Sequence, residues 1–205
     1  MPLVHLNNPA FVYYIPAKTA STSLVSALCS QFPAAEVLYD KHGIFVPPEL
    51  LRLQDKKIFM TVRNPYARVV SAWNFFSHNL SFSDFVRSVG FTRYRNKLWH
   101  ALPCSWWDDA VPLAKEYLRT EYLLEDLNKL QLGNHTFKTL PVLRTSDEVY
   151  RVRRYKDENK PWPEVYAIAD ISVVAKLYAE DFRRYGYPVD WEENVKMFTR
   201  ENNSR

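Results

Sequence analysis

Residues 11–29, FVYYIPAKTASTSLVSALC, constrain the fold more than any other stretch of the chain. The apolar and β-branched run from Phe11 to Ile15 predicts a buried strand, and Pro16 ends it. A short polar loop follows. Apolar residues at helical spacing from Leu24 onward then predict a helix that ends near Phe32. A strand, a loop and a helix in this order are typical of an α/β domain.

The polar loop is a candidate site for an anion. Its polar side chains crowd the start of the predicted helix: Lys18, Thr19, Ser21, Thr22 and Ser23. The first N–H groups of a helix have no intrahelical partner, and the helix dipole is positive there, so a phosphate or sulfate group fits this position. Hydroxyl side chains that merely cap the helix are the alternative. The loop has no glycine and is therefore not a Walker A loop; small residues, Ala17, Ala20 and Ser21, would let the backbone approach a ligand.

A second strand–loop–helix unit follows at residues 56–76. Ile58 to Val62 predicts another buried strand, and Tyr66 to Phe76 continues with helical spacing. Arg63 stands at the carboxyl end of this strand, whereas Arg68 and Ser71 lie on the helix. An arginine fork and a serine hydroxyl suit a second phosphate. The alternative is a buried arginine that pairs with a carboxylate.

The rest of the chain predicts further elements of one α/β domain that spans residues 1–205. The expected elements are a strand at 36–39, a short helix at 47–54, a helix at 80–90, a surface loop at 91–112, a mixed segment at 111–132, a polar loop at 140–150, a helix at 170–185 closed by Gly186, and a disordered tail from about residue 198. Polar residues after the strand at 36–39 include His42. Such residues tend to lie at the edge of a sheet where α/β active sites form.

Composition limits the classes of protein and ligand. The net charge of +4, from 27 basic and 23 acidic side chains, favours anionic ligands without choosing between a nucleotide, a sulfated sugar and a nucleic acid. The densest basic run is Arg151–Lys156, for which a solvated face is the alternative. The two cysteines are expected to be free thiols. The chain has no apolar run of about 18 residues and no secretory signal, so we expect a cytoplasmic protein without a membrane anchor.

The two loops, KTASTS and VRNPYARVVSAW, lie in this order about 45 residues apart. Together they resemble the sulfotransferases that use 3′-phosphoadenosine 5′-phosphosulfate (PAPS), most closely the carbohydrate-type family that includes heparan sulfate 2-O-sulfotransferase. The likeness continues through KHGIFVPPELL, SFSDFVRSVG, RTEYLLEDL, LPVLRTS and LYAEDFRRYGY, and so covers nearly the whole chain. It implies a P-loop-like domain with a central, mainly parallel sheet flanked by helices.

The resemblance also implies roles for individual residues. Lys18 and the backbone of Thr19, Ala20, Ser21, Thr22 and Ser23 would hold the 5′-phosphosulfate, with Lys18 beside the bridging oxygen. Arg63 and Ser71 would hold the 3′-phosphate. The later loop with Arg144, Thr145 and Ser146 would close over the nucleotide, and His42 would be the catalytic base. The chain departs from the family pattern in placing Ala17 between Pro16 and Lys18.

The implied reaction moves a sulfuryl group to a hydroxyl acceptor, with a saccharide as the expected acceptor. An unperturbed histidine pKa near 6.5 suits proton acceptance at neutral pH. No metal, nucleic-acid partner or membrane is expected. Two other functions remain open: a P-loop-like kinase or nucleotidase, and a non-catalytic basic module that binds glycans or nucleic acid through Arg151, Arg153, Arg154 and Lys156. The oligomeric state is left open.

Overall fold

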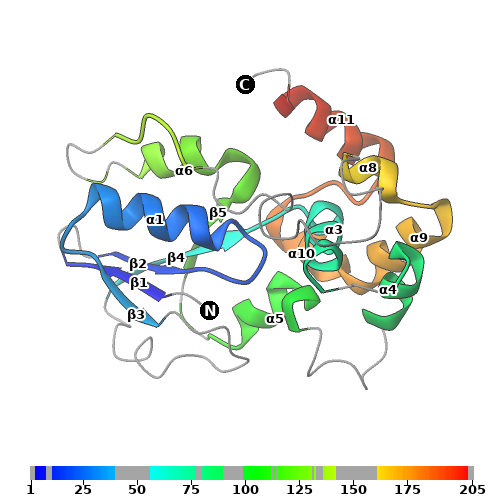
Figure 1. Ribbon diagram of the computed structural model, residues 1–205, viewed down its shortest axis with the longest axis horizontal. Helices are drawn as coiled ribbons and strands as arrows, with labels where there is room; N and C mark the ends of the chain where they lie inside the picture. The colour runs from blue at the N-terminus through cyan, green and yellow to red at the C-terminus, as the bar shows by residue number, and fades with distance from the viewer. Residues whose placement is uncertain are drawn as a thin grey trace. The chain divides into compact units, whose positions relative to one another are not determined.

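The computed structural model describes residues 3–7, 11–39, 56–76, 80–89, 99–111, 113, 115–130, 132, 136–141 and 161–202 (Figure 1). The chain divides into two compact units. The first contains Met1–Arg63 and Trp107–Thr145, and the second contains Asn64–Trp106 and Ser146–Arg205. The first unit carries the sheet and the second consists of helices. We describe each unit by itself.

The sheet of the first unit has five strands in the order β3-β1-β2-β4-β5. Their bounds are β1 Leu3–Leu6, β2 Phe11–Tyr14, β3 Glu36–Tyr39, β4 Lys57–Val62 and β5 Lys115–Arg119. β2 pairs with β4, and β4 with β5, in parallel. β1 is antiparallel to both of its neighbours. Four strands therefore run in one direction, and the expected α/β architecture with a mainly parallel sheet is confirmed.

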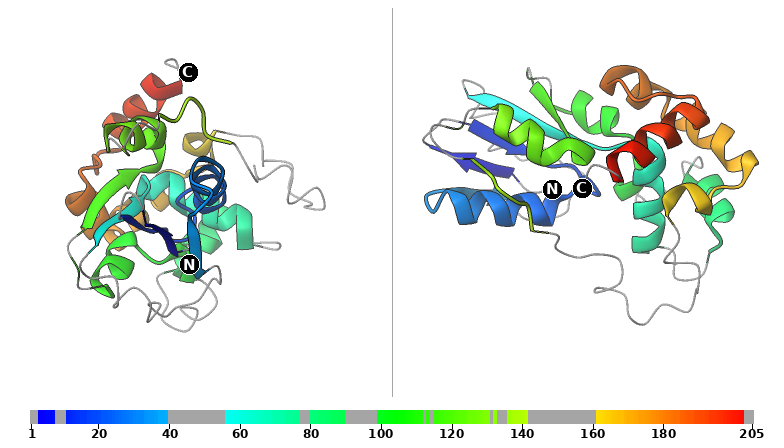
Figure 2. Two further views of the ribbon diagram at one scale, coloured as in Figure 1. Left: turned by 90° about the vertical axis from the view of Figure 1, so that its left-hand side faces the viewer. Right: turned by 90° about the horizontal axis from the view of Figure 1, so that it is seen from above.

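Two helices cover one face of this sheet. They are α1, Ser21–Gln31, and α6, Leu123–Lys129, which follows the short 3-10 helix η3, Thr120–Tyr122 (Figure 2). Alternate strand residues and both helices form a continuous apolar core that includes Val4, Leu6, Tyr13, Ile15, Leu24, Leu28, Phe59, Leu118, Leu123 and Leu127. Side chains that alternate with these along the strands, including Leu3, Val12, Tyr14, Ile58 and Met60, are buried on the other face. Burial on both faces explains why β2 and β4 have nearly continuous apolar sequences.

Strand β1 was not predicted from the sequence. It has only four residues, and His5 interrupts its apolar pattern. Its position between β2 and β3 nevertheless buries the whole strand, and His5 is only 7% exposed. Pairing on both sides supplies the stability that so short a strand lacks on its own.

The second unit is helical and packs around aromatic side chains. Its helices are α3 Pro65–Phe76, α4 Phe82–Val89, η2 Trp99–Ala101, α8 Trp162–Val165, α9 Ile168–Leu177, α10 Ala179–Tyr185 and α11 Trp191–Asn202. α5, Cys104–Asp109, begins in this unit. The ring of Tyr66 lies within 6.2 Å, centroid to centroid, of the rings of Trp162, Tyr166, Phe182 and Trp191. Aromatic pairs at such distances add to the free energy gained from burying their area.

Three expectations for the helical segments differ from the structure. The helix expected at 170–185 is two helices, because Tyr178 leaves helical geometry between α9 and α10. Gly186, with a φ of 71°, ends α10 as expected. Residues 99–109, expected in a surface loop, form η2 and α5, and Ala101, Cys104 and Trp107 are fully buried. α11 extends to Asn202, into the segment predicted as a disordered tail.

Buried polar side chains hold the start of α5 in place. Tyr178 donates to the carbonyl of Ala101, and Arg68 donates to that of Leu102. The carboxylate of Asp181 accepts the N–H groups of Cys104 and Ser105 at 2.6 and 2.7 Å. These anchors come from residues far apart in the sequence. They explain why the segment is ordered without a periodic apolar pattern.

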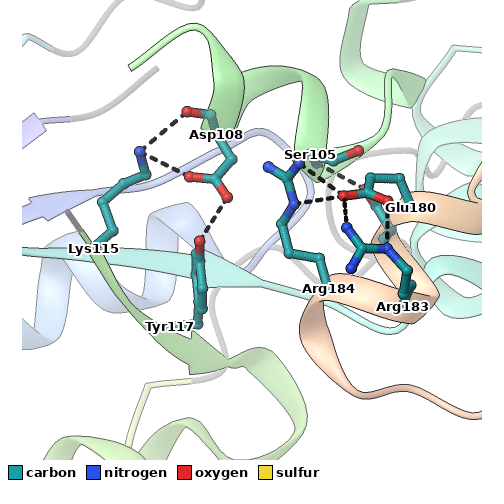
Figure 3. Close-up of polar contacts among 8 residues, drawn as sticks. Ser105, Asp108, Lys115, Tyr117, Glu180, Arg183 and Arg184 are labelled. Atoms are coloured by element: carbon teal, nitrogen blue, oxygen red, sulfur yellow. Dashed lines mark hydrogen bonds and ion pairs between the residues drawn. The ribbon is translucent and has the colours of Figure 1, made fainter. Parts of the chain in front are cut away.

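A second buried network joins α5 to β5 within the first unit (Figure 3). The ammonium of Lys115 lies 2.8 Å from Asp108 Oδ1, and both side chains are at most 5% exposed. Lys115 also donates to the carbonyls of Asp108, Val111 and Leu113, and Tyr117 donates to Asp108 Oδ2 at 2.7 Å. Oxygen acceptors therefore surround the ammonium. This saturation makes the network a structural support and not a ligand site.

In the part of the chain that the structure describes, no helix is long and apolar enough to cross a bilayer.

Replacing Lys115 by methionine should destabilise the protein by about 3–5 kcal/mol, because the carboxylate of Asp108 stays buried without its cation. Urea unfolding followed by circular dichroism measures the change. The matched control is Lys57→Met. Lys57 forms a 2.7 Å pair with Glu116 in which both side chains are about half exposed, and its loss should cost less than about 1 kcal/mol. Equal losses for the two variants would contradict the structural role of the buried pair.

Candidate functional site

The carboxyl ends of β2 and β4 bring together the two loops that the sequence singled out. β2 continues into residues 15–20 and then α1, and β4 continues into Arg63. Because the strands are parallel neighbours, both loops leave the sheet at the same edge. Nη1 of Arg63 donates to the carbonyl oxygen of Lys18 at 3.3 Å. The structure thus brings Arg63 into contact with the backbone of the loop that contains Lys18.

The backbone of the 16–20 loop, defined as Pro16 to Ala20, has an unusual conformation. Lys18 and Ala20 have φ values of 65° and 60°, in the left-handed region where glycine is the usual residue. Each such residue costs about 1–2 kcal/mol relative to the right-handed conformation. Ala17, the departure from the family pattern, is 1% exposed and packs into the interior. Backbone strain of this kind is maintained only where surrounding contacts enforce it, and it is typical of functional loops.

The hydroxyl of Thr19 forms hydrogen bonds within the protein. It donates to the carbonyl of Pro16 at 2.6 Å and lies 2.6 Å from the hydroxyl of Thr61 on β4. Thr19 is fully buried and Thr61 is 1% exposed. The side chain of Thr19 is therefore an anchor of the loop. The expectation that the Thr19 hydroxyl belongs to the anion site is therefore wrong, and a role for Thr19 in ligand binding is limited to its backbone.

The 16–20 loop enters the start of α1. Ala20 is the N-cap of this helix and makes no side-chain cap, and the first turn contains no acidic residue. The first bond within the helix is from the N–H of Leu24 to the carbonyl of Ala20 at 3.0 Å. The N–H groups of Ser21 and Thr22 thus have no carbonyl within the helix to pair with. The side chains of Ser21, Thr22 and Ser23 are partly exposed around this end.

Three helices of the second unit use their own side chains at this position, whereas α6, α8 and α10 have no side-chain cap, like α1. Ser81 accepts the N–H of Asp84 before α4, Asp190 accepts that of Glu193 in α11, and Asn64 accepts that of Tyr66 in α3. An anionic or polar cap satisfies the helix donors and its dipole internally. The start of α1 combines the absence of a side-chain cap with the neighbouring basic residues Lys18 and Arg63, and this combination makes it the candidate anion site.

Other predicted site residues lie elsewhere or outside the described residues. Ser71, expected beside Arg63, is partly exposed on α3 and belongs to the second unit. His42, the expected base, lies outside the residues that the structure describes. The same holds for the later loop with Arg144, Thr145 and Ser146, and for the basic run at 151–156.

For several other residues, the structure shows whether the side chain is buried in the core or exposed to a ligand. Arg68 is fully buried and donates to Leu102, so it supports the helical unit and is not exposed to a ligand. Trp107 and Trp162 are core residues, with 0% and 8% exposure, whereas Trp106 is 39% exposed. Cys29 and Cys104 are both free thiols. In the described part of the chain, no three His, Cys, Asp or Glu side chains are grouped as a metal would require.

A second charged cluster lies on the surface of α10 (Figure 3). Both Arg183 and Arg184 form ion pairs with Glu180, at 2.5 and 2.8 Å. Hydrogen bonds from the two guanidinium groups lower the pKa of Glu180 to about 2. The residues stand three and four positions apart, the usual spacing of pairs along an exposed helix. We therefore assign this cluster to the helix surface and not to a site.

The sequence analysis missed Thr61 as a residue of this site. The signal was present in the sequence, because Thr61 is the one hydroxyl residue in the apolar strand KIFMTV. Its partner could not be identified without the strand register. Met60 pairs with Tyr14 at the end of β2, so the following residue, Thr61, stands beside the loop that leaves that strand.

Replacing Ala20 by glycine should stabilise the protein by about 0.5–1 kcal/mol. The change removes the cost of a left-handed alanine, and the greater freedom of glycine in the unfolded chain offsets part of this gain. The matched control is Ala175→Gly inside α9, which should destabilise by about 1 kcal/mol. Thermal unfolding of both variants measures the changes. Destabilisation of Ala20→Gly to the same extent as the control would refute the left-handed assignment.

Comparison with known proteins does not assign this site. No family model matches the chain, and neither the curated proteins nor the solved structures compared with it give a significant match. The candidate site therefore rests on its own geometry: a strained loop without glycine, an uncapped helix start, and cations from two parallel strand ends.

Proposed function

We propose that this chain is a PAPS-dependent sulfotransferase that transfers a sulfuryl group to a hydroxyl, with a saccharide as the acceptor. The proposal includes the P-loop-like sulfotransferase fold for the sheet and its helices. One observation carries it: the 16–20 loop enters the uncapped start of α1 while Arg63, from the next parallel strand, contacts the carbonyl of Lys18. This arrangement supports binding of a compact anionic group at the sheet edge.

The residues at this edge fit the phosphosulfate end of the cosubstrate. Lys18 and the backbone N–H groups of Thr19 to Ser23 would bind its oxygens. When bound, the cosubstrate supplies the sulfuryl group and a nucleotide phosphate as the leaving group. Lys18 would stabilise the negative charge that develops on that leaving group, and a fixed cation is effective because it needs no reorganisation during the reaction. The protein would act mainly by positioning, as in phosphoryl transfer.

Arg63 would have two roles. One N–H of its guanidinium bonds the Lys18 carbonyl, and the planar guanidinium group has the fork geometry that suits a phosphate. Arg63 would bind the 3′-phosphate. Arg144, Thr145 and Ser146 would close over the nucleotide.

His42 would accept the proton of the acceptor hydroxyl. A neutral imidazole is a suitable base near pH 7, because its ordinary pKa lies close to that pH. The hydroxyl oxygen would then attack the sulfur in line with the departing phosphate. Each step uses a side chain of this protein and needs no metal.

Calorimetric titration should show that 3′,5′-adenosine bisphosphate binds more tightly than 5′-AMP or ATP. The comparison with 5′-AMP isolates the 3′-phosphate, and Arg63→Ala should remove most of the difference. Arg87→Ala, an exposed arginine of α4, is the control and should bind as the wild type does. A preference for ATP would favour a kinase, and no nucleotide binding would favour the glycan-binding alternative. Either result would contradict the proposed cosubstrate.

His42→Ala should lower turnover at least about 100-fold and leave bisphosphate affinity within about twofold, since loss of a general base acts on the chemical step. Turnover is measured by transfer of labelled sulfate from PAPS to a panel of saccharides. His135→Ala is the control, because the sequence gives His135 no role. A large loss of nucleotide affinity in His42→Ala would show a structural role for the histidine instead.

A further inference from the structure

We propose that Thr61 is a positioning residue that holds the 16–20 loop in its binding conformation through a chain of two buried hydroxyl groups. The inference rests on the function proposed above, because it concerns the same anion site. The hydroxyl of Thr61 forms a hydrogen bond with that of Thr19 in the loop, at 2.6 Å, and Thr19 in turn contacts the carbonyl of Pro16 at 2.6 Å. The chain thus runs from strand β4 to the loop that follows β2.

The direction of the hydrogen bonds follows from the partners. The carbonyl of Pro16 has no hydrogen, so Thr19 must donate to it. A hydroxyl has a single hydrogen, so the bond between the two threonines must be donated by Thr61 and accepted by Thr19. The two bonds form an ordered relay from Thr61 to Thr19 to Pro16. Removal of the Thr61 hydroxyl leaves the oxygen of Thr19 buried without this donor, which costs free energy.

The relay acts where the backbone is strained. Thr19 lies directly between Lys18 and Ala20, the two residues with left-handed φ values. The hydrogen bonds of Thr19 with Pro16 and with Thr61 of β4 fix the middle of the turn. Arg63 donates to the carbonyl of Lys18. Loss of the anchor would let Lys18 and Ala20 move toward right-handed geometry. Lys18 and the start of α1 would then no longer face one ligand.

The sequence of β4 agrees with a specific need for the hydroxyl. The neighbours of Thr61 along the strand, Met60 and Val62, are apolar and fully buried, and Thr61 itself is 1% exposed. Valine has nearly the shape of threonine and a high preference for strands. Packing alone would therefore be satisfied by valine, and the hydrogen bond to Thr19 is the feature that distinguishes threonine.

Thr61→Val tests the relay directly. Amide hydrogen exchange of the full-length protein, without ligand, should become at least about fivefold faster at Lys18 to Thr22, which is the effect of about one net hydrogen bond. Calorimetry should show about fivefold weaker binding of 3′,5′-adenosine bisphosphate. Thr61→Ser, which restores the hydroxyl, should return both quantities to within about twofold of the wild type.

Thr120→Val is the matched control. The hydroxyl of Thr120 also donates to a backbone carbonyl at this sheet edge, that of Val62, at 2.9 Å, but does not contact the 16–20 loop. The control should leave loop exchange and binding within about twofold of the wild type. An equal effect in Thr120→Val and Thr61→Val would refute a specific relay and indicate general loosening of the edge.

The remaining outcomes separate this inference from the proposed function. Unchanged loop exchange in Thr61→Val, or faster exchange with unchanged binding, would overturn the positioning role. If the wild type does not bind the bisphosphate, the proposed function fails, and the exchange comparison still decides whether Thr61 holds the loop. If Thr61→Val does not unfold cooperatively, Thr61→Cys, which replaces the hydroxyl by a weak donor, is compared in the same way.

Discussion

The parallel pairing of β2 with β4 is the interaction on which the candidate site depends. Phe11 pairs with Lys57 and Tyr14 with Met60, so two segments about 45 residues apart end at one edge of the sheet. A shift of this register by one residue would move Thr61 away from Thr19 and turn alternate side chains to the opposite face. Burial of both strands on both faces opposes such a shift. The apolar core thereby fixes the polar contacts at the edge.

Much of the fold could be predicted because its strongest elements carry local signals. The apolar runs of β2 and β4 and the helical spacing of α1 and α3 were sufficient to place these elements. β1 could not be found in this way, because its four residues become a strand only through pairing on both sides. The segment at 99–109 was also missed. Its order comes from hydrogen bonds with Arg68 and Asp181, which are distant in the sequence and therefore cannot be predicted from a local pattern.

The sequence indicated which loop forms the candidate site, but not the hydrogen bonds that hold this loop in its conformation. The resemblance gave Lys18 and Arg63 roles on one cosubstrate, and in the structure Arg63 contacts the backbone carbonyl of Lys18. Thr19 is a buried anchor in the structure, and Thr61 was not identified at all. Both facts depend on the register of two strands and on the backbone conformation of the loop. The placement of Ser71 on a helix followed from its spacing, whereas His42 and the loop at 144–146 stay predictions.

Two groups of polar residues in the first unit show how a structural network differs from a candidate binding site. Around Lys115, three carbonyls and a carboxylate surround one ammonium, so no donor of that cation is left for a ligand. At the start of α1 the N-cap makes no side-chain cap, and Arg63 contacts the carbonyl of Lys18 in the loop that leads into the helix. The 16–20 loop also maintains two left-handed residues where glycine would be easier. A loop that only connected a strand to a helix would gain stability from a cap and from glycine. The combination of backbone strain, a helix start without a side-chain cap and neighbouring basic residues is therefore the observation on which the proposed anion site rests.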